Sequence, residues 1–129
     1  MTRQAIHSPH APQAIGTYSQ AMRAGDLIFL SGQLGLHPET LELESTIEAE
    51  IARAFDNLAA VCQAAGGSLN NLVKVNIYLT ELAHFQAVND AMKARFTEPY
   101  PARAAVGVAS LPKGGRVEVE GVLYLPASA

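Results

Sequence analysis

The segment from Leu72 to Thr80 alternates apolar and polar side chains over its whole length, and this pattern constrains the fold more than any other part of the chain. In a strand, successive side chains point to opposite faces of the sheet. The apolar set would face one way, namely Val73, Val75, Ile77 and Leu79; the polar set would face the other, namely Lys74, Asn76, Tyr78 and Thr80. We expect a strand that is covered on one face only.

Two stretches with helical spacing flank this strand. The first begins near Ser45, where Ser45-Thr46-Ile47-Glu48 fits a capping box, and Gly66-Gly67 ends it. Its apolar stripe is Ile47, Ile51, Ala54 or Phe55, Leu58, Cys62 and Ala65. The second runs from about Leu82 to Phe96, with the stripe Phe85, Val88, Met92 and Phe96, and ends before Pro99 and Pro101. Both stripes predict helices packed by one face against the strand.

Four further strands complete the predicted order ββ-α-β-α-ββ. Residues 7–16 predict irregular chain, and two short strands between Tyr18 and Leu30 turn at Gly25-Asp26, the second ending at Ser31-Gly32. Arg103–Ala109 and Val117–Leu125 also alternate. We expect one α+β domain over residues 1–129, with two helices on one face of a mixed sheet. The other face would be solvated or would line an oligomer; it would carry Lys74, Asn76, Tyr78, Arg103, Glu118 and Glu120.

Composition narrows the functional classes. The formal net charge is −3, and nine Lys and Arg residues scattered along the chain form no cluster for nucleic-acid phosphates. One cysteine allows no disulfide within the chain, and no apolar run approaches a membrane span. No signal peptide is visible either, so we expect a soluble cytoplasmic protein without nucleic-acid or membrane partners. Much of the 49% hydrophobic content is alanine, which hints that a subunit interface contributes to stability.

The residues alone suggest one chemical site. Arg103 begins a strand whose same-side residues Ala105, Gly107 and Ala109 are small, which favours close approach of a ligand to an Arg that can fork onto a carboxylate. Glu118, expected on the neighbouring strand, could orient or deprotonate a water. Both could equally be solvated strand residues, and Asn89 on the second helix could simply make a local hydrogen bond. The histidines have no metal-ligand spacing, so no metal is expected.

The chain resembles the RidA (YjgF) family over Ala11 to Leu123. The resemblance rests on four motifs in order: Ala14-Ile15-Gly16-Thr17-Tyr18-Ser19-Gln20, Ser31-Gly32-Gln33, Pro101-Ala102-Arg103, and Leu111-Pro112 with Val117-Glu118-Val119-Glu120. It implies a chorismate-mutase-like α+β fold assembled as a homotrimer, with sites between subunits. It also implies hydrolytic deamination of 2-iminopropanoate, 2-iminobutanoate or bulkier imino or enamine acids to 2-keto acids, without a cofactor.

The resemblance also implies roles for particular residues. Arg103 would clamp the substrate carboxylate and Glu118 would position the attacking water. Substrate-binding positions would be Tyr18, Ser31, Gly32, Asn89, Met92 and Ala105. Met92 and Ala105 stand where archetypal members often carry Tyr and Cys, and residues 97–101 are shortened, so we expect relatively better use of bulkier apolar imines. The alternatives are a non-catalytic trimeric carboxylate binder or chaperone-like protein, and an endoribonuclease or translation inhibitor.

Overall fold

The structure is a computed structural model that describes residues 2–127. Its strands and α-helices follow in the order β1 (Gln4–Ile6), β2 (Ala21–Ala24), β3 (Leu27–Leu34), α1 (Ile47–Ala64), β4 (Leu72–Leu79), α2 (Phe85–Arg95), β5 (Ala102–Gly107) and β6 (Val117–Tyr124). Three short 3₁₀ segments, η1 (Leu69–Asn71), η2 (Leu82–His84) and η3 (Pro112–Gly114), precede β4, α2 and β6.

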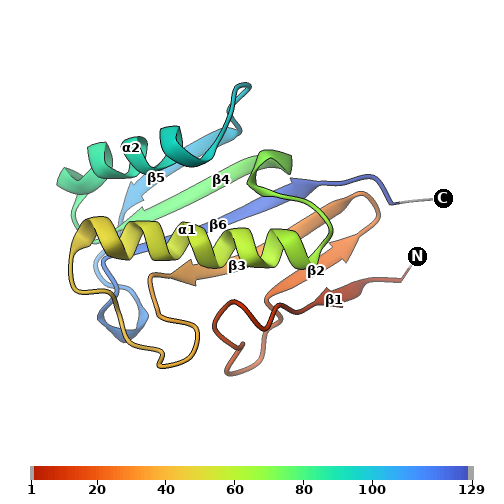
Figure 1. The fold of residues 1–129 in the computed structure, drawn as a ribbon, viewed down its shortest axis with the longest axis horizontal. Coiled ribbons are helices and arrows are strands. Elements are labelled where there is room, and N and C mark those ends of the chain that lie inside the picture. Colours follow the sequence, from red (N-terminus) through yellow and green to blue (C-terminus); the bar gives the residue numbers. More distant parts are fainter. Residues whose placement is uncertain (1, 128–129) are drawn as a thin grey trace.

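The strands form one mixed sheet in the order β1-β2-β3-β6-β4-β5. Neighbouring strands are antiparallel except for β4 and β5, which are parallel and are joined through α2. Figure 1 shows both helices on the same side of the sheet, with α1 crossing its middle and α2 lying over the β5 edge. The expected α+β class, with two helices on one face of a mixed sheet, is confirmed.

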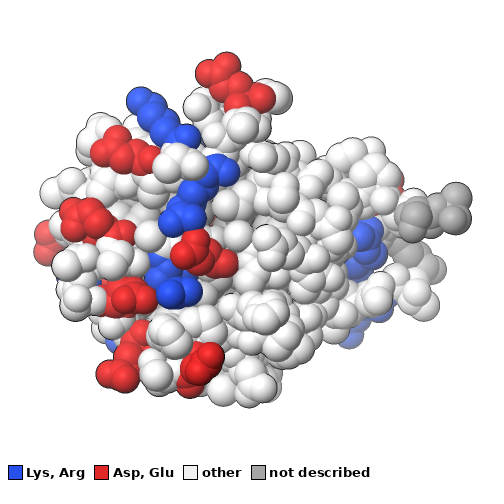
Figure 2. Space-filling view, in the orientation of Figure 1, with Lys and Arg blue, Asp and Glu red and all other residues white. Residues whose placement is uncertain are grey.

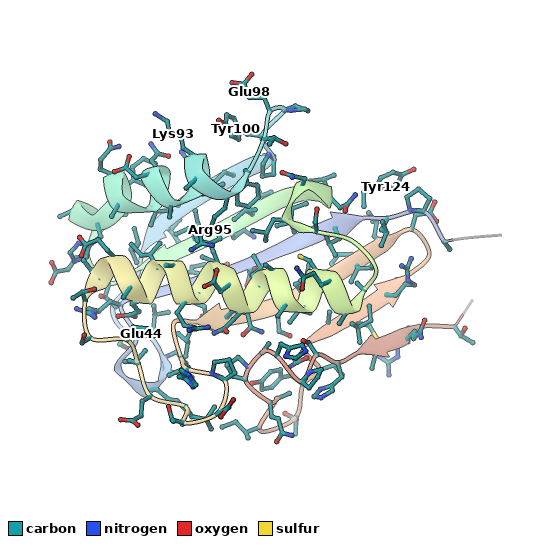
Figure 3. The ribbon with its side chains drawn as sticks, in the orientation of Figure 1. Glu44, Lys93, Arg95, Glu98, Tyr100 and Tyr124 are labelled. Atoms are coloured by element: carbon teal, nitrogen blue, oxygen red, sulfur yellow. The ribbon has the colours of Figure 1, made fainter. Side chains whose placement is uncertain are left out.

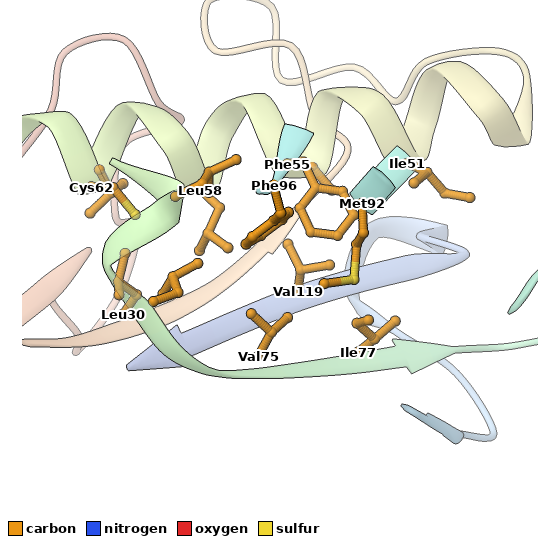
Figure 4. Close-up of a cluster of buried hydrophobic side chains, with 14 of the residues drawn as sticks. Leu30, Ile51, Phe55, Leu58, Cys62, Val75, Ile77, Met92, Phe96 and Val119 are labelled. Carbon is orange, nitrogen blue, oxygen red and sulfur yellow. The ribbon is translucent and has the colours of Figure 1, made fainter. Parts of the chain in front are cut away.

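The hydrophobic core fills the space between the helices and the sheet (Figure 4). Phe55 and Leu58 of α1 are fully buried against Val75, Ile77 and Val119 of the sheet. The rings of Phe55 and Phe96 meet edge to face, with centroids 6.0 Å apart, so the end of α2 is packed against α1. The helical stripes in the sequence correctly identified this core.

Both helices begin later than their sequence patterns indicate. Thr46, not Ser45, caps α1: its hydroxyl oxygen accepts from the Ala49 N–H at 3.1 Å. The single-turn segment η2 occupies residues 82–84, and α2 begins only at Phe85. Helical periodicity therefore predicted both helices but placed the first residue of each too early in the chain.

Several strand predictions need correction. β3 continues past Ser31-Gly32 to Leu34, because an irregularity between Leu30 and Gln33 lets its pairing with β6 resume. Val73 is 47% exposed and not part of the core; a register shift at the start of β4 turns Leu72 inward in its place. β1 had no sequence signal, and β5 ends at Gly107 and not at Ala109.

A buried carboxylate ties α1 to the start of β6. Glu50 is fully buried, and its Oε1 accepts from Arg116 Nε at 2.6 Å. Its Oε2 accepts from the backbone N–H groups of Arg116 at 2.6 Å and Val117 at 3.3 Å. The helix thereby holds the two residues that directly precede Glu118.

The helix-bearing side of the molecule carries charges of both signs. Figure 2 shows Lys and Arg interspersed with Asp and Glu over the helices, and a largely uncharged area toward the end where the termini lie. In Figure 3, Arg95 of α2 points toward α1, where its Nη1 donates to Asp56 Oδ1 at 2.6 Å. Glu98 and Tyr100 lie on the loop beyond α2. None of the helices among residues 2–127 is long and apolar enough to cross a membrane.

Candidate functional site

Arg103 lies at the start of the edge strand β5 and is held by one face of α2. Its guanidinium carbon is 4.9 Å from the centroid of the Phe85 ring, its Nη1 donates to Asn89 Oδ1, and the same nitrogen is 3.7 Å from Met92 Sδ. Positions 85, 89 and 92 recur at helical spacing, so one stripe of α2 contacts one face and one nitrogen of the guanidinium. Stacking and hydrogen bonding together fix its plane.

This arrangement leaves part of the guanidinium available. Among the contacts of residues 2–127, Asn89 and Met92 engage Nη1, so the edge formed by Nε and Nη2 is left for an incoming group. A depression of about 350 Å³ lies beside it, bounded by Asn89, Met92, Lys93, Tyr100, Pro101 and Arg103. A carboxylate matches two parallel N–H donors of this kind.

Glu118 belongs to a second and larger cavity, of about 590 Å³, on the other side of the sheet. Its polar wall includes Tyr18, Ser31, Gly32, Gln33, Lys113, Glu118 and Glu120, and its apolar wall includes Ile15, Leu34, Leu36 and Leu41. Gly32 makes room for the carboxyl group: a Cβ at this position would lie 2.7 Å from both Cδ and Oε2 of Glu118. Gly32 of the Ser31-Gly32 motif thus leaves the space that the Glu118 carboxyl group occupies.

Glu118 has the electrostatics of a base. Partial burial raises the pKa of its carboxyl group, and the neighbouring charge of Glu120 raises it further. Within residues 2–127, its side chain makes no hydrogen bond that would favour the ionised form over the protonated one. A carboxylate in this setting accepts a proton more readily than one in water.

The structure corrects the expected relation between Arg103 and Glu118. β4 lies between their strands, so β5 and β6 are not neighbours. Arg103 pairs with the buried Val75 and contacts α2, which places it on the helix-covered face and not on the polar face. Glu118 pairs with Tyr78 on the uncovered face. The small residues after Arg103 do not form an open floor either, because a Cβ at Gly107 would meet Leu82 at 3.2 Å and Ala105 packs against the core.

The other predicted positions divide between the two places. Asn89 and Met92 lie with Arg103, whereas Tyr18, Ser31 and Gly32 lie with Glu118. Tyr18 is half-exposed on the cavity wall, and the Ser31 hydroxyl donates to the Ser19 carbonyl oxygen at 2.5 Å. Ala105 shares the side of β5 on which Arg103 lies. No group of three or more His, Cys, Asp or Glu side chains in residues 2–127 is placed to hold a metal ion.

Sequence reasoning missed two contributors. Phe85 was assigned to the apolar stripe, yet its ring stacks on Arg103. Lys113 was not among the expected site residues, yet it lines the Glu118 cavity from a backbone with positive φ. A single aromatic residue in a helical stripe gives no sign that an Arg from a distant strand will lie on it, and a turn lysine is common on any surface.

The class of protein that these features indicate is an α+β domain with a mixed sheet and two hollows of a size suited to small molecules, one beside Arg103 and one beside Glu118. The family model described as Endoribonuclease L-PSP matches residues 8–124. The chain is 44% identical to the 2-iminobutanoate/2-iminopropanoate deaminase of Dermatophagoides farinae, over 95% of this chain and 97% of that protein. The chain belongs to this family, the RidA family, as its motifs predicted.

Solved structures agree with the fold. The crystal structure of RidA from an Antarctic Psychrobacter species superimposes with a TM-score of 0.92 at 52% identity, covering 95% of this chain and 99% of that one. E. coli TdcF with bound serine superimposes with a TM-score of 0.87 at 31% identity, covering 94% and 98%.

Proposed function

We propose that the protein is an imine deaminase that hydrolyses 2-imino acids, and their enamine tautomers, to 2-keto acids and ammonia. The observation that carries the proposal is the Arg103 cradle, which presents two parallel N–H donors suited to a carboxylate. The 2-iminobutanoate/2-iminopropanoate deaminase relative, similar over nearly the whole chain, supports the reaction type. TdcF with bound serine supports a small carboxylate as ligand.

The active site we propose is shared between two subunits of a homotrimer. Within one chain, the Cα atoms of Arg103 and Glu118 are separated by about 10 Å across the sheet and about 10 Å along it. Their side chains also lie on opposite faces. A 2-imino acid is too short to bridge them. If Arg103 of one subunit docks beside the Glu118 cavity of the next, both groups reach one substrate.

In this site, each residue has a defined task. Arg103 binds the carboxylate and fixes C2 next to Glu118, where positioning itself lowers the barrier. Glu118 takes a proton from a water as the water oxygen bonds to C2, and the electrons of the C=N bond move to nitrogen. That proton passes to the nitrogen and gives a carbinolamine. The hydroxyl proton of the carbinolamine then passes to the same nitrogen as the C=O bond forms and the C2–N bond breaks, so ammonia leaves a keto acid. The other proposed substrate-binding residues are Tyr18, Ser31, Gly32, Asn89, Met92 and Ala105.

The description of the family as endoribonuclease raises RNA cleavage as a rival. Twelve Asp and Glu residues outnumber nine Lys and Arg, and Figure 2 shows the two signs interspersed on the helix-bearing side. Binding to a phosphate backbone needs a contiguous basic surface. The charge pattern therefore favours a small carboxylate over RNA as substrate.

A coupled assay tests the deaminase function. A dehydratase generates the imine from serine or threonine, and keto-acid release is timed with and without the protein. We expect faster release with the protein and a loss of that effect in Arg103→Ala. Equal rates for the wild-type protein and Arg103→Ala would rule out the assigned site.

Mixing variants tests the shared site. Arg103→Ala and Glu118→Gln would each be inactive alone. Refolded together in equal amounts, they would restore about a quarter of the sites, because a neighbouring pair then supplies the intact Arg and the intact Glu at random. Absence of any restored activity in trimers shown to be mixed would contradict a site made by two subunits.

A further inference from the structure

Two acidic residues face the same cavity from one strand. Glu118 and Glu120 are two residues apart on β6, so their side chains leave the same face, and both line the 590 Å³ cavity. Val117, Val119 and Gly121 between and around them are buried on the helix side. Two carboxylates this close repel each other when both are ionised, so other contacts must stabilise their arrangement on one face.

Glu120 is anchored, whereas Glu118 is not. Asn76, directly opposite Glu120 on β4, donates its Nδ2 hydrogen to Glu120 Oε2 at 3.1 Å. The hydroxyl of Tyr78 donates to the same oxygen, also at 3.1 Å. Two donors on one carboxylate oxygen fix its position. Burial, followed by the hydrogen bond to Glu120, raises the pKa of Tyr78, so this phenol remains a donor.

From these contacts we propose that Glu120 is a positioning residue for Glu118: its carboxylate, held by Asn76 and Tyr78 on the same face of β6 as Glu118, assists the transfer of a proton from the attacking water to Glu118. The inference rests on the proposed deaminase function. It assigns the Asn76–Tyr78–Glu120 network to the reaction, although none of its three members needs to touch the substrate.

The surroundings of Glu118 are consistent with this role. The titratable groups that line its cavity are Tyr18 from the segment before β2, Glu120 from β6 and Lys113 from η3; β3 contributes the uncharged Ser31, Gly32 and Gln33. Tyr78 of β4 is the cross-strand partner of Glu118. Glu120 is the charged group that raises the pKa of Glu118, in addition to burial. A proton acceptor made more basic by its environment is a better general base, provided it is ionised at the working pH.

The test compares the wild-type protein with Glu120→Gln. The amide keeps the side-chain shape and an oxygen for Asn76 and Tyr78, but removes the charge. We expect the acid limb of the kcat profile to move to lower pH and the plateau kcat to fall about three- to tenfold, with KM within about twofold. Glu120→Asp keeps the charge and should retain the acid limb of the wild-type protein. A Glu120→Gln profile with an unmoved acid limb would overturn the proposal, even if kcat fell, because a structural role alone would lower kcat without moving the limb.

Two additions separate this proposal from the proposed function. Glu48→Gln removes an exposed carboxylate in the first turn of α1 and should leave the pH profile unchanged. Titration of the ¹³C-labelled Glu118 carboxyl group by NMR needs no catalysis; its midpoint should be lower in Glu120→Gln than in the wild-type protein. A protein without deaminase activity would fail the proposed function, whereas an unmoved NMR midpoint would show that Glu120 does not act on Glu118.

Discussion

At the scale of single residues, we expect ligand binding at Arg103 to depend on the orientation of the guanidinium plane as much as on its charge. Phe85 stacks on it and Asn89 holds one nitrogen, so the free edge has a fixed direction. An ammonium group at the same place would keep the charge and lose the two parallel donors and the stacking. Binding at this position therefore depends on geometry that only an Arg supplies.

Arg103→Lys tests this dependence. Loss of charge-assisted hydrogen bonds of about 1.5–3 kcal/mol should lower kcat/KM roughly tenfold to a hundredfold in the coupled assay. Arg95→Lys is the matched control. Arg95 pairs with Asp56 away from the depression, so this variant should keep the kcat/KM of the wild-type protein. Equal kcat/KM for Arg103→Lys and the wild-type protein would contradict bidentate binding.

Ionisation of Glu118 should also lower the free energy of unfolding of the protein. Its pKa is raised in the folded protein, so the folded state binds the proton more tightly than the unfolded chain. The free energy of unfolding then falls as pH rises through the interval between the two pKa values. Glu118→Gln should unfold at higher denaturant concentration than the wild-type protein at pH 7, and the difference should vanish below about pH 4, near the ordinary pKa of Glu. A Glu118→Gln variant less stable at pH 7 would show that the carboxylate is favourably bound in the fold.

Residue-level prediction from sequence succeeded in part, for a definable reason. The motifs singled out Arg103 and Glu118, and the structure gives each a built environment. Their placement on one face failed because alternation within a strand says nothing about which strand lies next to it. β4 separates them, and only the register with Val75 and Tyr78 reveals the opposite faces.

At the scale of elements, α1 positions β6 through one carboxylate. Glu50 accepts hydrogen bonds from the side chain and backbone of Arg116 and from the backbone of Val117. A Cβ at Gly35 would lie 2.3 Å from the Glu50 carbonyl oxygen, so β3 and its following loop also approach closely here. The sequence analysis did not identify Glu50, because sequence spacing gives no sign that a helix carboxylate will be buried against a distant Arg.

Glu50→Ala should therefore be strongly destabilising. The backbone N–H groups of Arg116 and Val117 would lose their acceptor in a partly or fully buried place, where each unsatisfied group costs about 1–3 kcal/mol. We expect the free energy of unfolding to fall by more than about 2 kcal/mol in urea denaturation. Glu44→Gln disrupts the partly exposed pair with Arg53 and should cost at most about 1 kcal/mol. Similar losses for the two variants would mean that Glu50 does not clamp β6.

The elements themselves followed from the sequence where the period was long and regular. We predicted β4, α1 and α2 correctly because each packs one face against the core, so that its apolar residues recur at the period of a strand or a helix. β1 was missed because three residues carry no measurable period, and Val73 was misassigned because a register shift breaks the alternation locally. Helix starts were displaced because Ser45 and Thr46 are both competent caps.

At the scale of the whole molecule, the sheet is covered on one side only. The face opposite the helices carries exposed apolar side chains, namely Leu27, Phe29, Val106 and Tyr124, beside the network of Asn76, Tyr78 and Glu120. A solvated sheet face would not need such large apolar groups. The separation of Arg103 from Glu118 adds a second reason for a partner copy, because the proposed site needs both residues.

These two features predict an assembly in solution, and the resemblance to the RidA family implies that it is a homotrimer. Burial of the uncovered face should make the assembly persist on dilution, and its sites should form only within it. Light scattering should report three times the chain mass at micromolar concentration, unchanged over a tenfold dilution. Phe29→Glu places a charge on this face and should shift the mass toward the monomer and abolish imine hydrolysis together, whereas Leu82→Glu, a change at an exposed apolar residue on the helix side, should leave the mass unchanged. A stable monomer of the wild-type protein with full activity would contradict both the trimer and the shared site, since Arg103 and Glu118 of one chain cannot meet on one substrate.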